Sequence, residues 1–285
     1  MGAGNAIGVL GGDRRQIYFA RSVAADGYPV FLCGFEQSGE TGDLPSVDQQ
    51  ELFLRCRTIV LPLPATKDGA TLNAPFARGA IALDDDFAAN CIGKTVYGGM
   101  MDRLLQTSEF WSRVPVYDYY AREELTVGNA FLTAEGALGL AISEYDGAVG
   151  GSRCLVTGFG RIGKALCLAL KGLGAHVDCC ARKPQDLAAI RALGCGALEY
   201  REVKTGYDLI FNTVPAPVIN ARLLALQRPD TLLIELASRP GGIDLPAAKR
   251  LNLRVIDAQS LPGRMSPRAS GELIKEAIYN MMEES

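Results

Sequence analysis

The sequence is poor in the side chain that most often transfers protons and binds catalytic metals. Its 285 residues include one histidine, His176. A metal site of the H-E-x-x-H kind needs two histidines, so it is excluded, and no catalytic metal is expected. A nucleophile elbow of the form G-x-S-x-G is also absent. Where a reaction needs a proton acceptor, it must therefore be Asp, Glu, Lys, Tyr or water.

The chain also lacks an excess of charge and a long apolar run. Its 29 Lys and Arg residues stand against 32 Asp and Glu residues, a net charge of −3. Because this balance leaves no basic surface, nucleic acid is not an expected partner. No N-terminal segment has the layout of a signal peptide. No apolar run approaches the roughly 20 residues that span a bilayer. We expect a cytoplasmic protein without a membrane contact.

The cysteines lack the spacing of metal or redox motifs. None of the eight forms a C-x-x-C pair, and several lie in apolar runs. A free cysteine in such a run behaves as a small hydrophobic core residue, as in a reducing cytoplasm. We therefore expect free, buried thiols at Cys33, Cys56, Cys91, Cys154, Cys167, Cys179, Cys180 and Cys195.

Strands that alternate with helices predict two parallel sheets. In the first half, an apolar strand leads through Gly11 and Gly12 to a helix with Asp13 as its N-cap. Residues 36–50 are polar and predict a loop. In the second half, a new strand–helix series begins at residue 153. The strands are expected at 6–10, 29–33, 58–61, 94–97, 114–117, 153–157, 176–180, 208–212, 231–235 and 253–256.

Two long helical patterns organise these sheets. Apolar residues recur at helical spacing from Ala130 to Tyr145, which predicts a linker helix at 129–147. Residues 261–267 predict a stiff loop that enters a last helix, with Ser266 as N-cap and Pro267 as first residue. We expect this helix to fold back on the first domain. The predicted domains are a substrate-binding and catalytic domain at 1–128, completed by 266–285, and a dinucleotide-binding domain at 129–265.

A glycine-rich turn follows the first strand of the second domain and opens a helix. This context is what a G-x-G-x-x-G motif requires to bind a dinucleotide. The first glycine permits the tight turn, the second admits the pyrophosphate, and the third allows the helix to pack on the strand. The N–H groups of the helix then face the phosphates. The segment consists of Gly158, Phe159, Gly160, Arg161, Ile162 and Gly163.

The fold class predicted from this pattern is α/β. It comprises two Rossmann-like doubly wound domains joined by a long helix, with a C-terminal helix that returns to the first domain. His176 begins a strand behind the glycine turn, on the adenosine side of such a site, and we expect it to be structural.

The residues that follow the next strand favour NADP. An NAD site usually has an acidic residue there, which binds the ribose 2′-OH. Here Arg182 and Lys183 occupy the position, and Asp178 lies too early on the strand. Arg182 suits a 2′-phosphate because its guanidinium binds phosphate with two parallel hydrogen bonds. NAD stays possible, since the two cations also suit a solvated loop.

Two further strand ends are candidates for contact with the ribose and nicotinamide. In open α/β sheets, the carboxyl ends of the strands line the ligand crevice. The first end carries Thr213, Val214 and Pro215, and the second carries Leu236 and Ala237. The first of these segments is alternatively a proline-stiffened loop.

Three residues are candidates for the reacting end of the site. Arg15 lies at the start of the first helix, where a helix N-terminus and a guanidinium favour an anion. Arg239 follows the strand at 231–235 and is placed to reach an anionic substrate. Glu135 lies on the linker helix, where we expect a cleft between the domains. A capped helix and exposed surface charges are the alternative interpretations.

These segments together resemble the family of dipicolinate synthase A subunits. The resemblance spans nearly the whole chain in the family's order. Its most specific parts are the opening Gly-Gly-Asp-x-Arg-Gln and the later Ala-Ser-Arg-Pro-Gly-Gly. The matching stretches are 11–13 with 15–16, 133–136, 158–163 with 181–182, 212–213 with 215, 237–242 and 261–263.

The resemblance implies the oxidation of dihydrodipicolinate to dipicolinate in the mother-cell cytoplasm of a sporulating bacterium. It also implies a flavoprotein-like dipicolinate synthase B subunit as partner, and we expect a homo-oligomer. The substrate is a cyclic dianion, for which Arg15 and Arg239 are the expected cationic anchors. Aromatisation drives the reaction, so Glu135 or a water molecule suffices as proton acceptor. The alternatives are another two-domain dehydrogenase, acting on alanine or a 2-hydroxy acid, and a cofactor-binding protein without chemistry of its own.

Overall fold

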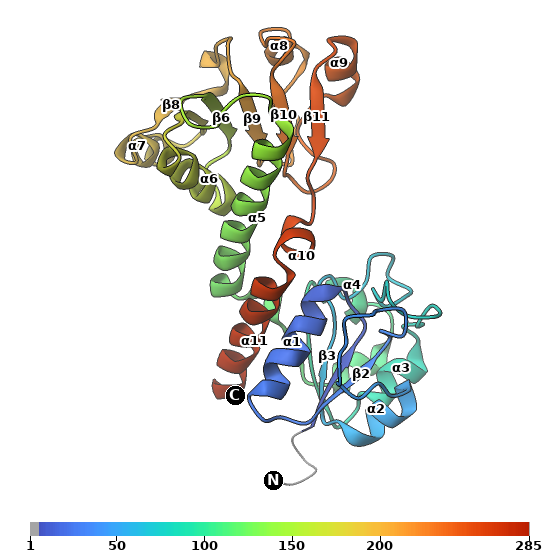
Figure 1. Ribbon diagram of the computed structural model, residues 1–285. Coiled ribbons are helices and arrows are strands. Elements are labelled where there is room, and N and C mark those ends of the chain that lie inside the picture. The colour runs from blue at the N-terminus through green and yellow to red at the C-terminus, as the bar shows by residue number, and fades with distance from the viewer. Residues whose placement is uncertain (1–5, 285) are drawn as a thin grey trace. The chain divides into compact units, whose positions relative to one another are not determined.

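The computed structural model describes residues 6–284 (Figure 1). The chain divides into two compact units. Unit 1 comprises residues 1–128 together with 266–285, and unit 2 comprises residues 129–265. Each unit is built on one parallel sheet, as the alternation of strands and helices predicts. The predicted α/β class with two Rossmann-like domains is confirmed.

Unit 1 contains a five-stranded sheet in the order β2-β1-β3-β4-β5. All four pairings are parallel. The chain passes from β1 to β2 on one side and then crosses to β3 on the other side of β1. The ends of β1 and β3 therefore lie at a topological switch point, where α/β proteins bind ligands. The strands are β1 (Ile7–Leu10), β2 (Val30–Cys33), β3 (Thr58–Val60), β4 (Thr95–Gly98) and β5 (Val116–Asp118).

Helices cover both faces of this sheet. One face packs in a cluster with Leu52 and Phe87 from α2 and α3. The other packs in a cluster with Ile17 of α1 and Ile274 of α11. The helices of unit 1 are α1 (Arg14–Ala25), α2 (Gln49–Arg55), α3 (Asp85–Asn90), α4 (Asp102–Leu105), the 3-10 helices η1 (Glu109–Arg113) and η2 (Tyr119–Ala121), and α11 (Pro267–Glu283).

The C-terminal helix α11 lies beside α1 (Figure 1). A Cβ atom on Gly271 would lie 2.7 Å from the backbone nitrogen of Phe19, so only glycine allows this close approach. Farther along, Lys275 pairs with Asp26 at 2.9 Å. The prediction that the last helix returns to the first domain is confirmed. Ser266 is the N-cap residue, but its side chain makes no capping hydrogen bond.

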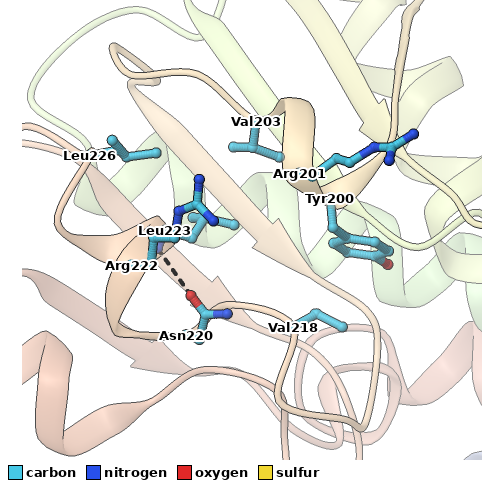
Figure 2. Close-up of a pocket in the computed structure, with 8 residues that line it drawn as sticks. All are labelled: Tyr200, Arg201, Val203, Val218, Asn220, Arg222, Leu223 and Leu226. Carbon is cyan, nitrogen blue, oxygen red and sulfur yellow. Dashed lines mark hydrogen bonds between the residues drawn. The ribbon is translucent and has the colours of Figure 1, made fainter.

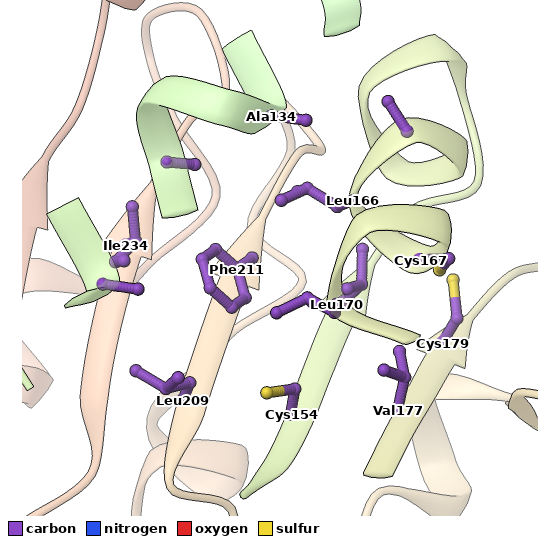
Figure 3. Packing of buried hydrophobic residues seen from close by; sticks show 14 of the residues in the cluster. Ala134, Cys154, Leu166, Cys167, Leu170, Val177, Cys179, Leu209, Phe211 and Ile234 are labelled. Carbon is purple, nitrogen blue, oxygen red and sulfur yellow. The ribbon is translucent and has the colours of Figure 1, made fainter. Parts of the chain in front are cut away.

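Unit 2 contains a six-stranded parallel sheet in the order β11-β10-β9-β6-β7-β8. This is the strand order of a dinucleotide-binding fold. One face is covered by α5 (Glu123–Glu144), α6 (Arg161–Gly172) and α7 (Pro184–Ala192). The core between these helices and the sheet includes Ala134, Leu166 and Phe211 (Figure 3). The strands are β6 (Arg153–Thr157), β7 (His176–Cys180), β8 (Gly196–Leu198), β9 (Leu209–Asn212), β10 (Leu232–Glu235) and β11 (Arg254–Asp257).

The opposite face of this sheet has its own core, in which Tyr207 and Leu224 are buried. The helices of unit 2 are the greater part of α5 (Glu123–Glu144), then α6 (Arg161–Gly172), α7 (Pro184–Ala192), η3 (Tyr200–Glu202), α8 (Ala221–Leu224), α9 (Leu245–Arg250) and α10 (Leu261–Met265).

Three predicted boundaries were wrong. The linker helix covers Glu123–Glu144 instead of 129–147, because acidic residues favour a helix start at Glu123 and Glu124 before the apolar periodicity begins. The expected loop at 36–50 ends in the first two residues of α2, whose N-cap is Asp48. The segment from Leu261, predicted as a stiff loop, forms α10 because Pro262 fits the first turn of a helix.

The eight cysteines are free and buried, as predicted. Among residues 6–284, one helix, α5, is long and apolar enough to cross a membrane by length and composition alone. Its alanines at positions 134, 137 and 141 pack in the core of unit 2. A core helix passes the same test of length and hydropathy, so this feature is weak evidence for a membrane span.

Candidate functional site

The glycine turn between β6 and α6 has a geometry that only glycine allows at two positions. Gly158 has a φ of +92°, and a Cβ atom there would lie 2.6 Å from the Val214 side chain. A Cβ atom on Gly163 would lie 2.1 Å from the carbonyl oxygen of Gly158. The Gly158 N–H donates to the Cys180 carbonyl at 3.0 Å, which ties the turn to β7. The turn is therefore tight, and α6 packs directly against it.

Gly160 differs from these two glycines because it faces open space. A Cβ atom there would have no neighbour within 4 Å. Gly160 is also the N-cap of α6, and no side chain caps this helix. The first N–H groups of α6 are therefore not satisfied by a capping side chain, at the end where the helix dipole is positive. This arrangement suits a pyrophosphate.

The end of β7 presents a cation and no acid. Arg182 is exposed just beyond the strand, and its side chain has no hydrogen bond or ion pair within residues 6–284. Lys183 is the N-cap of α7 without a capping bond from its side chain. Asp178 is engaged elsewhere, since its carboxylate accepts a hydrogen bond from the Tyr207 hydroxyl at 2.7 Å. In NAD sites a carboxylate at this position binds the ribose 2′-OH, and this strand end has no such carboxylate.

A pocket of about 280 Å³ lies beside Tyr200, in the segment that follows β8 (Figure 2). Tyr200 forms part of the pocket wall. Burial raises the pKa of its hydroxyl to about 12, although the positive charge of Arg182 acts to lower it. Two cations line the pocket, of which Arg201 pairs with Glu199 at 3.0 Å. The lining residues are Tyr200, Arg201, Val203, Val218, Asn220, Arg222, Leu223 and Leu226.

A buried polar pair joins the carboxyl ends of β9 and β10. The Asn212 amide donates to Glu235 Oε1 at 2.6 Å, and both residues are at most 6% exposed. Glu235 Oε1 also accepts from the Ala237 N–H, and Oε2 accepts from the N–H groups of Gly242 and Ile243. Sequence reasoning did not assign Glu235 a role. The signal was present, because each of two buried strands ends in a polar residue.

Most of the predicted cofactor residues on these strand ends are engaged within the protein. The Thr213 hydroxyl donates to the Thr157 carbonyl at 2.8 Å, so its hydrogen is already used. Leu236 and Ala237 are buried at 6% and 3% exposure, and their N–H groups donate to the Asn212 carbonyl and to Glu235. Pro215 is exposed. Val214 contacts the glycine turn, so the turn and the two strand ends form one edge of unit 2.

Arg15 lies at the corresponding edge of unit 1. Asp13 caps α1 and accepts from Arg15 Nε at 2.9 Å and from Nη2 at 2.8 Å. Nη2 also donates to the Leu63 carbonyl, in the segment after β3. Burial lowers the pKa of Arg15, but the hydrogen bonds and charge of Asp13 outweigh burial and raise it above its usual value. The guanidinium is thus fixed and charged.

A cavity of about 490 Å³ adjoins this edge. Two of its residues, Leu72 and Ala74, pack where a Cβ atom on Gly11 would lie. Asn73 donates its amide to the Pro64 carbonyl at 3.1 Å, so the cavity wall and Arg15 hold the same segment after β3. The lining residues are Lys67, Asp68, Thr71, Leu72, Asn73, Ala74, Pro75, Ala77, Gly79 and Ala80.

The other candidate residues lie in unit 2. The Arg239 side chain is 75% exposed and pairs with Asp257 at 2.8 Å. Glu135 is exposed on α5. His176 is exposed at the amino end of β7, the opposite edge from the glycine turn, so its expected position on the adenosine side was wrong. Among residues 6–284, no group of three His, Cys, Asp or Glu side chains could hold a metal ion.

Known proteins resemble both units. Residues 6–120 match the family model of the N-terminal domain of the dipicolinate synthase A subunit. The A subunit of dipicolinate synthase from Bacillus subtilis (strain 168) is 28% identical over 290 residues, covering 99% of this chain and 97% of the relative. The resemblance to this family is confirmed.

Solved structures of dipicolinate synthase A extend the likeness to the whole fold. The crystal structure from Bacillus subtilis has a TM-score of 0.85 and 27% identity, covering 100% of this chain and 97% of that one. The structure from Bacillus halodurans has a TM-score of 0.86 and 25% identity, covering 99% and 98%. Residues 141–247 match the NAD-binding domain of D-isomer specific 2-hydroxyacid dehydrogenases. Unit 2 therefore contains a nicotinamide-dinucleotide-binding domain of the dehydrogenase type.

Proposed function

We propose that this chain is an NADP-linked oxidoreductase that converts dihydrodipicolinate to dipicolinate. The observation that carries the proposal is the full-length similarity to the dipicolinate synthase A protein, at 28% identity over 99% of the chain. The dehydrogenase-type domain at 141–247 supports a nicotinamide cofactor. Together they favour hydride transfer to a bound dinucleotide over a structural role.

NADP is the proposed form of the cofactor. The residues that fit it are the open Gly160 at the start of α6 and the exposed, unpaired Arg182 after β7. Gly160 leaves room for the pyrophosphate, and Arg182 with Lys183 supplies positive charge for the 2′-phosphate. The pocket in Figure 2 adds Tyr200 as a flat wall for the adenosine. The bound dinucleotide would supply the hydride acceptor.

The substrate side of the proposal rests on charge. Dihydrodipicolinate carries two carboxylates, and Arg15 is fixed by Asp13 with its positive charge retained. We propose Arg15 as the anchor of one carboxylate. Arg239, which shares its charge with Asp257, is proposed as a further cation that contributes to substrate binding. Holding the donor carbon and the hydride acceptor in a reactive geometry is then the main catalytic task.

Oxidation releases a hydride and a proton from the ring, and the product is aromatic. Because aromatisation drives the step, the proton acceptor needs no special tuning. Glu135, exposed on α5, or a water molecule is proposed to take the proton. The single histidine is exposed at the other edge of its sheet and takes no part in this scheme.

The cellular setting follows from the same similarity. We propose that the chain works in the cytoplasm of the mother cell during sporulation. We also propose that it assembles with a flavoprotein-like B subunit of dipicolinate synthase and forms a homo-oligomer. The relatives' designation as the A component of a synthase supports the proposal of a partner subunit.

The test is a coupled assay with the purified chain, freshly generated dihydrodipicolinate and NADP, with and without the proposed partner protein. NADPH formation at 340 nm that depends on the substrate supports the proposal. Turnover of alanine or 2-hydroxy acids, with none of dihydrodipicolinate, would favour another dehydrogenase. Tight NADP binding without hydride transfer in either mixture would indicate a cofactor-binding protein without its own chemistry.

A further inference from the structure

The helices α1 and α11 run parallel, so their first turns lie at the same edge of unit 1. A Cβ atom on Gly271, in the second turn of α11, would lie 2.8 Å from the carbonyl oxygen of Arg15. Farther along both helices, Ser22 donates to Glu272 at 2.8 Å and Lys275 pairs with Asp26. The residue numbers of α1 and α11 therefore increase in the same direction along their contact. The residues just before Gly271 therefore lie beside the start of α1.

Arg268 is in the first turn of α11 and belongs to this edge. Arg268 lies four residues before Glu272, so the two side chains are on the same side of α11. Glu272 contacts Ser22 of α1 on this side. The Arg268 side chain is exposed and has no ion pair or hydrogen bond within residues 6–284. The carboxylates at the start of α1 are already engaged, since Glu40 pairs with Arg14 and Asp13 with Arg15. Arg268 thus carries a positive charge that no side chain of the described chain neutralises.

Arg15 supplies the second half of the arrangement. Its Nε and Nη2 atoms are bonded to Asp13 and to the Leu63 carbonyl, whereas Nη1 has no partner within residues 6–284. The side chain is only 12% exposed, so Nη1 is a donor that the fold holds in place. A guanidinium with one end fixed and the other free binds a carboxylate with little loss of side-chain entropy.

We propose that Arg268 and Arg15 together hold the two carboxylates of a ring dicarboxylate. This inference rests on the proposed function and adds a specificity-determining residue to it. One carboxylate binds Arg15, and Arg268 recognises the second. Both cations belong to unit 1. A ring with a single carboxylate would lose the contact with Arg268 and bind more weakly.

The test compares binding of pyridine-2,6-dicarboxylate and pyridine-2-carboxylate by isothermal titration calorimetry, without cofactor. We expect the wild-type chain to prefer the dicarboxylate by about 10-fold or more, the value of one charge-assisted hydrogen-bonded contact. Arg268→Gln should remove most of this preference and leave the affinity for the monocarboxylate nearly unchanged. Arg268→Lys should restore part of it. Arg15→Gln should weaken both ligands.

Arg57→Gln is the matched control, because Arg57 is exposed just before β3, at the opposite edge of the sheet. It removes the same charge and should keep the preference. A wild-type chain without the preference, or an Arg268→Gln chain that retains it, would overturn the inference. Turnover is measured separately. A chain that discriminates through Arg268 but forms no NADPH contradicts only the proposed function, whereas turnover without an effect of Arg268 on discrimination contradicts only this inference.

Discussion

Asn212 and Glu235 form a buried hydrogen bond of 2.6 Å that joins the carboxyl ends of β9 and β10. The Glu235 carboxylate also accepts three backbone N–H groups from the segment that follows β10. Asn212 in turn accepts from the Thr157 hydroxyl at 2.6 Å, which extends the network to β6. The Glu235 carboxylate therefore fixes the backbone that follows β10 and, through the Asn212 side chain, connects it to the end of β9.

Glu235→Gln should destabilise unit 2. Both carboxylate oxygens accept hydrogen bonds, and the amide end of glutamine would instead direct N–H groups at other donors. A buried donor left unsatisfied costs about 1–3 kcal/mol. We expect a loss of this size in the free energy of unfolding, measured by urea denaturation.

Glu276→Gln provides the matched change on the exposed part of α11. It should alter the free energy of unfolding by less than about 0.5 kcal/mol, as is usual for surface positions. Equal stability of the two variants would show that the Glu235 network is not required by the fold.

Arg182→Asp should change the choice of cofactor. The exposed guanidinium has no protein partner to lose within residues 6–284, so the effect on folding should be small. Loss of charge-assisted bonds to a 2′-phosphate should weaken NADP binding about 10- to 100-fold. NAD lacks this phosphate and should lose little. The measurement is the dissociation constant for each nucleotide, with Arg191→Asp on α7 as control. An equal loss of affinity for NADP and NAD would mean that Arg182 does not bind the 2′-phosphate.

Arg239→Leu should damage turnover and spare dinucleotide affinity. The side chain is exposed and pairs with Asp257 at the surface, so stability should change little. We expect kcat/KM for dihydrodipicolinate to fall by about 10-fold, the value of one charge-assisted contact. Asp257→Asn, which frees Arg239 from its ion pair, should not reduce turnover. A comparable fall in NADP affinity in Arg239→Leu would place this arginine in the cofactor site.

The sequence was sufficient for the features that depend on local pattern. The glycine spacing at 158–163 and the alternation of strands predicted both sheets, and the apolar stripe after Pro267 predicted a helix that docks on the first domain. What it did not reveal depends on contacts between distant segments. Glu235 ends an apolar strand, and only the fold shows that four donors meet its carboxylate.

The start of α5 shows a different limit. Apolar periodicity begins at Ala130 because the first turns of this helix carry Glu123 and Glu124 instead. Where acidic residues stabilise the first turn of a helix through the helix dipole, that turn has no apolar stripe by which the sequence would show it. The parallel packing of α1 and α11, which brings Arg268 to the edge that holds Arg15, is likewise set by a close contact at Gly271 that has no counterpart in sequence spacing.

Two alanine substitutions in the glycine turn should separate cofactor binding from folding. Gly160→Ala adds a methyl group that meets no protein atom within 4 Å, and the backbone there has a φ of −79°, which alanine adopts freely. The free protein should keep its stability to within about 0.5 kcal/mol. A methyl group at the expected pyrophosphate position should nevertheless weaken binding of NADP and NAD alike, since both carry this group.

Gly163→Ala is the contrasting change, because its methyl group would lie 2.1 Å from the Gly158 carbonyl oxygen. The turn must shift to accept it, so this variant should lose both stability and nucleotide affinity, with an unfolding cost of about 1–3 kcal/mol as for other overpacked sites. Thermal unfolding with and without NADP measures both effects in one experiment. A Gly160→Ala chain whose melting temperature still rises with NADP as in the wild type would mean that the phosphates do not bind above this glycine. The open space at the start of α6 would then not be the dinucleotide site.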